Sequence, residues 1–444
     1  MALRRRHHIA MAAAQPASSL RFTSPPHTIA HYQQVSPGHR AQVLIRWGDK
    51  VLRDAPVFDP RQQHAEAQEM QFGYNNDFVA FMPLPRGSTN STHGLLCVNQ
   101  EYTNPELMFP GLTKTNAVRT MTREQAEVEM AAHGHSIIEI RKEKAGWRVV
   151  EGSPYNRRIS ARSTPMTIAG PAAGHDRLKT KADPTGRHII GTLNNCAGGV
   201  TPWGTVLIAE ENFNDYFGGD PDGLPEAASY KRLGIKGKSA YAWSRFFERF
   251  DIEKAPNEPN RFGWVVEIDP YDPKSVPVKR STLGRFKHEA ATCVVAPDGR
   301  VVVYSGDDEA FEYIYRFVTA GQYNPKNLAA NRNLLDEGIL SVARFDEAGT
   351  LCWLPLVFGH GPLTPANGFQ SQADVLIDTR RAADLLGATP MDRPEDVEAN
   401  PVNGRVYVML TNNTTRKPEQ ISKMNPRASN AYGHILELLP PGTQ

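Results

Sequence analysis

Four short apolar segments recur along the chain, and each begins after a glycine turn and ends in carboxylates or amides. They are HGLLCVNQE ending at Glu101, WGTVLIAEEN ending at Asn212, DGRVVVYSGDDE ending at Glu309, and NGRVYVMLTNN ending at Asn413. Short runs rich in Val, Ile and Leu between turn residues predict β-strands. Because the four segments are alike, the chain is expected to repeat one β unit, as radially repeated β-folds do.

A residue able to bind a metal precedes the glycine turn in the last three copies. These residues are Cys196 in NNCAGGVTPWG, Glu289 in KHEAATCVVAPDG and Glu395 in RPEDVEANPVNG. Cys196 is expected in a turn, because glycine and asparagine surround it. Ligands at matching points of a repeated β unit can meet around one axis.

The segments between the repeats predict helices as well as strands. A helix is expected over TREQAEVEMAAHG with Thr122 as its N-cap, and residues 213–260 are expected to form a helical insertion. The repeats lie about 100 residues apart, well above the 40 to 50 of ordinary propeller repeats. Each interval should therefore hold more than one blade or a large insertion. The fold class predicted is all-β with helical insertions.

Composition allows a single large domain and excludes two classes of partner. The chain has 444 residues, and all-β folds of 250 residues or more can form one domain. Its formal net charge is +2 with Lys and Arg spread throughout, so neither a nucleic acid nor a charged membrane surface is expected as partner. No apolar run is long enough for a spanning helix. Residues 1–20 predict either a disordered tail or the remnant of an export signal.

Clusters of acids follow the predicted strands. Carboxylates are hard oxygen ligands of the kind that calcium and iron(III) bind. The alternative for any one cluster is a set of solvated loop residues. Three adjacent carboxylates repel one another unless a cation neutralises them, which favours a metal at the DDE segment. The candidate acids are Glu101, Glu210, Glu211, Asp307, Asp308, Glu309, Glu289, Glu395, Asp396 and Glu398.

Two neighbours of these acids have expected roles. His288 adjoins Glu289, and alternation along a strand lets only one of the two point inward, so Glu289 is assigned to the metal and His288 to a supporting position. Arg393 stands two residues before Glu395, and Pro394 favours an extended conformation at Arg393, which would place both side chains on one face. A guanidinium there could bind a phosphate oxyanion, or it could form an ordinary ion pair.

Several of these segments closely resemble the PhoX-type secreted alkaline phosphatases. The resemblance runs from about Leu20 to the final NAYGHILEL. It rests on the segments FGYNNDF, HGLLCVNQEYTNPELMFPG, NNCAGGVTPWGTVLIAEENF, RFKHEAATCVVAPDGRVVVYSGDDEAFEYIYRF and RPEDVEANPVNGRVYVMLTNN.

The resemblance implies a six-bladed β-propeller over residues 21–444 that hydrolyses phosphomonoesters with a cluster of Ca²⁺ and Fe³⁺. By the same resemblance, Cys196, Glu289 and Glu395 are iron ligands, and Glu211 and the DDE acids are calcium ligands. Asn212 and Arg393 are contacts to the phosphate, with catalytic roles. The family further implies a periplasmic or secreted protein, although residues 1–20 lack a recognisable export signal.

The family pattern continues past the C-terminal NAYGHILEL, so an incomplete propeller is expected, with a partner chain as one way to complete it. Three alternatives to the phosphatase are a calcium-stabilised propeller that binds ligands without hydrolysis, an inactive remnant, and another metal-dependent hydrolase such as a lactonase or phosphotriesterase, which would not need an arginine for a phosphate dianion. Cys196 and Arg393 discriminate against the first, because a structural calcium site needs no thiolate. The sequence contains no G-x-x-x-x-G-K-[ST] phosphate loop and no G-x-S-x-G elbow.

Overall fold

The computed structural model describes residues 22–439, and the chain divides into two units, residues 1–44 and residues 45–444. The described part of the first unit, residues 22–44, contains neither helix nor strand. The predicted tail, residues 1–20, lies outside the described residues. All elements below belong to the second unit.

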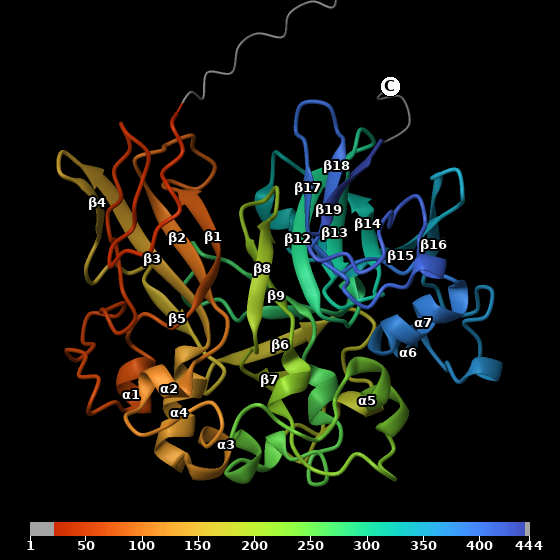
Figure 1. The fold of residues 1–444 in the computed structure, drawn as a ribbon, viewed down its shortest axis with the longest axis horizontal. Coiled ribbons are helices and arrows are strands. Elements are labelled where there is room, and N and C mark those ends of the chain that lie inside the picture. The colour runs from red at the N-terminus through yellow and green to blue at the C-terminus, as the bar shows by residue number, and fades with distance from the viewer. Residues whose placement is uncertain (1–21, 440–444) are drawn as a thin grey trace, which may run out of the picture. The chain divides into compact units, whose positions relative to one another are not determined.

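The described part of the second unit contains four β-sheets (Figure 1). The first sheet contains β1 (Asn76–Pro83), β2 (His93–Gln100), β3 (Gly134–Glu143), β4 (Gly146–Val149) and β5 (Arg157–Ile159). The second contains, in spatial order, β7 (His188–Ile190), β6 (Pro165–Ala169), β11 (Val278–Arg280), β10 (Val265–Ile268), β9 (Val206–Glu210) and β8 (Asn195–Val200). The third contains β12 (His288–Val295), β13 (Arg300–Asp307), β14 (Ile314–Gln322), β15 (Gly338–Phe345) and β16 (Leu351–Pro355). The fourth contains β17 (Pro394–Ala399), β18 (Val406–Leu410) and β19 (His434–Leu438).

The four repeated segments form one strand in each sheet, as the sequence predicts. They are β2, β9, β13 and β18, and each pairs antiparallel with a partner strand: β1, β8, β12 and β17 respectively. These partner strands also contact one another across the sheets, β8 lying against β1 and β12, and β12 against β17. The prediction of a mostly β-sheet protein is therefore confirmed, and the sheets meet along the strands that carry the candidate ligands.

The helices are short and lie before or between the strands in the sequence. Thr122 caps α4 in a capping box with Gln125, which confirms the predicted helix. The insertion over residues 213–260 holds α5 and several 3₁₀ turns, which confirms a helical insertion. Among the helices of residues 22–439, none is long and apolar enough to cross a membrane. The α-helices are α1 (Ala65–Gln68), α2 (Pro105–Met108), α3 (Ala117–Thr120), α4 (Arg123–Ala132), α5 (Ala227–Leu233), α6 (Gln372–Ile377) and α7 (Thr379–Leu386).

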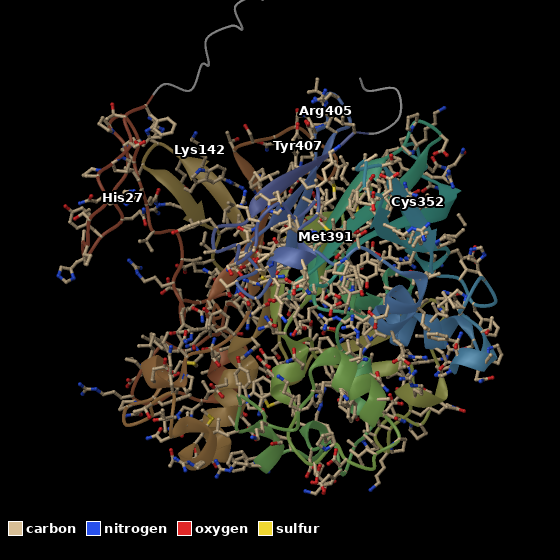
Figure 2. All side chains as sticks on the ribbon, turned by 45° about the vertical axis from the view of Figure 1, so that its right-hand side comes forward. His27, Lys142, Cys352, Met391, Arg405 and Tyr407 are labelled. Carbon is tan, nitrogen blue, oxygen red and sulfur yellow. The ribbon has the colours of Figure 1, made fainter. Side chains whose placement is uncertain are left out.

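The fourth sheet has an exposed end and lies beside the core at its other end. Arg405 and Tyr407 lie near one end of β18 and contact the exposed Glu437, whereas Met391 is buried in the core (Figure 2). Met391 immediately precedes the segment that leads into β17. The candidate ligand Glu395 thus follows a buried residue closely in the chain.

Candidate metal centre

Each of the four partner strands, β1, β8, β12 and β17, contains a β-bulge at or next to a residue able to bind a metal. The pairing register shifts after Asn76 in β1, after Asn195 in β8, after Glu289 in β12 and after Pro394 in β17. A bulge bends the strand and redirects a side chain, and bulges are frequent next to active sites. The residues at these four points are Asp77, Cys196, Glu289 and Glu395.

Of these four residues at the β-bulges, Asp77 is the one that the sequence did not predict as a ligand. Its segment, Asn75-Asn76-Asp77, parallels Asn194-Asn195-Cys196 in the second sheet, and Asn75 and Asn194 both have positive φ, 43° and 46°. Asparagine tolerates this conformation better than most residues. The doublet of asparagines before a potential ligand was therefore the available signal.

Cys196 lies in a strand, so the expectation that it sits in a turn was wrong. The glycines that suggested a turn allow close approach of backbones instead: a Cβ at Gly199 would lie 2.1 Å from the carbonyl oxygen of Ala291 in β12. Glycine within a strand marks such contacts. The glycines of β8 thus let the second and third sheets approach each other at the cysteine.

Two groups of donor atoms share the Cys196 thiol. Its Sγ and one carboxylate oxygen each of Glu211 and Glu289 all lie within 4.8 Å of one another, and so do Sγ and oxygens of Asp77 and Glu101. The five residues come from three different sheets or the loops that follow them. Tertiary structure thus gathers one soft and four hard donors at one place, as binding of more than one kind of cation requires.

Burial and mutual repulsion favour the protonated forms of these groups when no cation is bound. Burial, followed by Asp77 and Asp308, raises the pKa of Glu101 to about 7, and burial with Asp308 and Glu101 raises the pKa of Glu211 to about 9. Burial also raises the pKa of Glu289 and of the Cys196 thiol well above their usual ranges. Such a cluster is stabilised by bound cations.

Asp308 and Glu395 join the cluster through Arg393. The Arg393 guanidinium donates to Asp308 at 2.5 Å and to Glu395 at 3.1 Å. The other oxygen of Asp308, Oδ1, is buried without a hydrogen-bond partner within residues 22–439. A buried oxygen without a donor is costly unless a cation or water binds it, so this atom fits a metal ligand.

The backbone at Arg393 differs from the expectation, although the side chain reaches Glu395. Arg393 has φ of +55°, in the left-handed region, instead of the extended conformation predicted from Pro394. In this conformation a single nitrogen of the guanidinium, Nη2, donates to both Asp308 and Glu395. Strained backbone of this kind concentrates at functional sites.

Asp307 and Glu309 are placed away from the two donor groups. Arg380 donates to both oxygens of Asp307, at 2.5 and 2.8 Å, and to Glu309 at 2.7 Å, and Lys287 lies 3.2 Å from Glu309. The cation that neutralises Asp307 and Glu309 is thus the internal guanidinium of Arg380, and the prediction of a metal at the DDE segment stays open for Asp308 alone. Of the three acids, Asp308 alone lies beside Glu211.

His288 and Asn212 occupy supporting positions. Both ring nitrogens of His288 have partners, Ser305 and the carbonyl of Gly284, and burial lowers its pKa to about 3, so it is neutral. Ser305 donates in turn to the backbone carbonyl of Glu289. Asn212 donates to Glu211 at 2.5 Å, which places its amide at the edge of the cluster.

A mostly β-sheet fold and a partly buried set of thiol and carboxylate donors define a candidate metalloenzyme. A sequence model described as Alkaline phosphatase PhoX matches residues 20–444, and the chain belongs to this family. It is therefore an alkaline phosphatase, a metal-dependent phosphomonoester hydrolase.

A solved structure agrees with this assignment. The structure of Pseudomonas fluorescens PhoX in complex with vanadate, a transition state analogue, is 43% identical in sequence and superposes with a TM-score of 0.88. The match covers 94% of this chain and 72% of that chain. No curated protein matches the chain. Neither the family nor the solved relative supports the predicted partner chain.

Proposed function

We propose that the two donor groups around Cys196 hold iron and calcium, and that phosphomonoesters are hydrolysed there. The observation that supports this most strongly is one thiol shared by carboxylates from three sheets, all within 4.8 Å in each group. Thiolate with carboxylates suits iron, whereas sets of carboxylates suit calcium. The proposed iron ligands are Cys196, Glu289 and Glu395, and the proposed calcium ligands are Glu211, Asp308, Glu101 and Asp77.

Arg393 and Asn212 are proposed to bind the phosphate. The Arg393 side chain is 32% exposed, so it can reach a ligand while its Nη2 holds Asp308 and Glu395. A guanidinium and an amide can donate to the equatorial oxygens of the transferring group and stabilise its charge. Bound cations would offset the charge of the substrate dianion and supply an oxygen nucleophile without a serine.

The finer fold proposed is a single β-propeller over residues 21–444. Contacts of β8 with β1 and β12, and of β12 with β17, support it, because the innermost strands of propeller blades surround a common channel. Bulges near the start of all four partner strands also support this fold, because the proposed ligands would then lie at one end of such a channel. By family resemblance we propose a periplasmic or secreted protein.

Metal removal tests the function directly. Dialysis against a chelator is expected to lower turnover of p-nitrophenyl phosphate at least about 100-fold, because the charges that offset the substrate dianion and the source of the oxygen nucleophile would both be lost. Added calcium should restore activity when iron is retained, and elemental analysis of the purified protein should find both metals. Full turnover by a metal-free protein would refute the proposed centre, and calcium without turnover would favour a protein that only binds ligands.

Asp77 provides a separate test of the second donor group. Asp77→Asn is expected to raise the calcium concentration for half-maximal turnover at least about tenfold, because the amide keeps the size but lacks the charge. Asp298→Asn is the matched control, since Asp298 lies exposed in the turn between β12 and β13. Equal calcium titrations of the two variants would exclude Asp77 from the ligand set.

A further inference from the structure

In three of the four sheets, a buried polar residue stands one position before an acid of the metal centre. In the strand pairing, each of these polar residues lies opposite the residue that directly precedes a candidate ligand at a β-bulge. The opposite residues are Asn76, Asn195 and His288 respectively. The three therefore occupy one equivalent position. The pairs of buried residue and centre acid are Gln100 with Glu101, Glu210 with Glu211, and Asp307 with Asp308.

A buried cation from another element binds each of the three. Arg158 of β5 donates to Gln100 at 2.5 Å, Lys279 of β11 to Glu210 at 2.7 Å, and Arg380 of α7 to Asp307 at 2.5 Å. The three cations are at most 9% exposed. Successive side chains of an extended strand point to opposite faces. Each cation therefore lies on the face opposite to the acid of the metal centre that follows in the chain.

The environment of Glu210 shows how completely this position is held. Besides Lys279, its carboxylate accepts hydrogen bonds from the Thr192 hydroxyl and from the backbone N–H groups of Leu193, Gly263 and Trp264. A carboxylate with this many donors has no freedom to move. The side chain of the next residue, Glu211, therefore extends from a backbone that is held in place.

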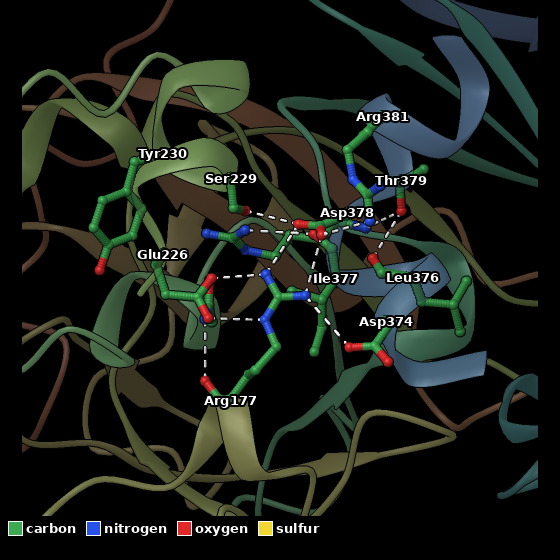
Figure 3. A network of polar contacts seen from close by, with 12 residues as sticks. Arg177, Glu226, Ser229, Tyr230, Asp374, Leu376, Ile377, Asp378, Thr379 and Arg381 are labelled. Atoms are coloured by element: carbon green, nitrogen blue, oxygen red, sulfur yellow. Dashed lines mark hydrogen bonds and ion pairs between the residues drawn. The ribbon is translucent and has the colours of Figure 1, made fainter. Parts of the chain in front are cut away.

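Arg380 is itself held by a network of ion pairs. It lies near the start of α7, where Asp378 accepts from Arg177 at 3.0 Å and from Ser229 of the α5 helix at 2.8 Å (Figure 3). Arg177 also binds Glu226, just before α5. The network fixes α7, and with it the guanidinium that binds Asp307.

From this repeated arrangement we infer that Arg158, Lys279 and Arg380 are positioning residues that hold Glu101, Glu211 and Asp308 for calcium. The inference rests on the metal centre proposed above. Without these cations, the charges of Glu210 and Asp307 would add to the repulsion among the centre acids, and the strand ends would lose their anchors. The fourth sheet differs, since its equivalent residue is the apolar Leu410.

Two neighbouring residues of β11 provide a matched test. Lys279→Met removes the cation that binds Glu210, the residue before Glu211. Arg280→Met breaks a similarly buried ion pair with Glu267. Glu267 lies opposite Leu207, three residues before Glu210, so this second pair is further from the metal centre along the strand. Both variants should unfold at lower temperature. Lys279→Met alone is expected to need about tenfold more calcium for half-maximal turnover and to bind less calcium in elemental analysis. At saturating calcium its kcat should return to the wild-type value, because Lys279 touches no substrate.

Unchanged calcium binding by Lys279→Met, with a thermal shift equal to that of Arg280→Met, would overturn the inference. If Lys279→Met does not fold, Arg380→Lys tests the inference instead. This variant keeps the positive charge but lacks the planar guanidinium, which donates to Asp307 and Glu309 at the same time. That variant should need more calcium than wild type, and an unchanged demand would overturn the inference. A wild-type chain that binds no calcium would instead refute the metal centre itself.

Discussion

Replacing Cys196 with serine is expected to lower kcat for p-nitrophenyl phosphate at least about 10³-fold, since metal ions supply several kcal/mol of charge stabilisation in such reactions. The thiol belongs to both donor groups, so its loss affects both. A serine hydroxyl is a poor substitute for a thiolate as an iron ligand. Iron content should fall with kcat.

Cys352→Ser is the matched control for this substitution. Cys352 is an exposed free cysteine on β16, in the outermost strand of the third sheet (Figure 2). Its replacement should change neither iron content nor turnover. A Cys196→Ser protein with wild-type iron and kcat would show that the thiol is not a ligand, whatever metals the carboxylates bind.

Replacing Arg393 with alanine is expected to lower kcat/KM about 10²- to 10³-fold, the range found when a preorganised donor to a developing charge is removed. The guanidinium is the cation nearest to Asp308 and Glu395. Inhibition by vanadate and by inorganic phosphate should weaken in parallel, because both are bound through the same oxygens. Arg393→Lys should recover part of the loss by charge alone.

Arg405→Ala controls for removal of an arginine from the same sheet. Arg405 pairs with the exposed Glu437 on β19, so its loss should have little effect on activity or stability. If Arg393→Ala bound phosphate as tightly as Arg405→Ala does, the guanidinium would serve only to neutralise Asp308 and Glu395. Metal content measured in both variants separates this outcome from loss of the centre.

The repeated pattern of the strands was readable without coordinates because it is local. Glycine turns, Val- and Ile-rich runs and terminal acids lie within a dozen residues of one another, and β2, β9, β13 and β18 follow them. The candidate ligands Cys196 and Glu289 were predicted from the same spacing, and the structure brings both into one donor group. Asp77 was missed because it precedes its glycine turn at Gly94 by a longer interval than Cys196 and Glu289 precede theirs.

The acids of the DDE segment required the tertiary structure. Three adjacent carboxylates are chemically equivalent in the sequence, and nothing local predicts that Arg380, about 70 residues later, binds two of them. Alternation along the strand sends Asp307 and Asp308 to opposite sides, but which side faces the centre depends on the packing of neighbouring sheets. Similarly, the glycines beside Cys196 indicate a turn when the sequence is considered alone. In the structure they lie in a strand, where they allow the backbone of β12 to approach closely.

By itself the sequence determined the β-rich class, the four strands with acidic ends, the family and most of the candidate ligands, because these depend on periodicity and short motifs. Only the tertiary structure decided which acids share the Cys196 thiol, which are neutralised by buried cations, and which backbone conformation carries Arg393. Those outcomes depend on contacts between residues far apart in the chain, and the distance between two charges decides whether they bind a metal or each other.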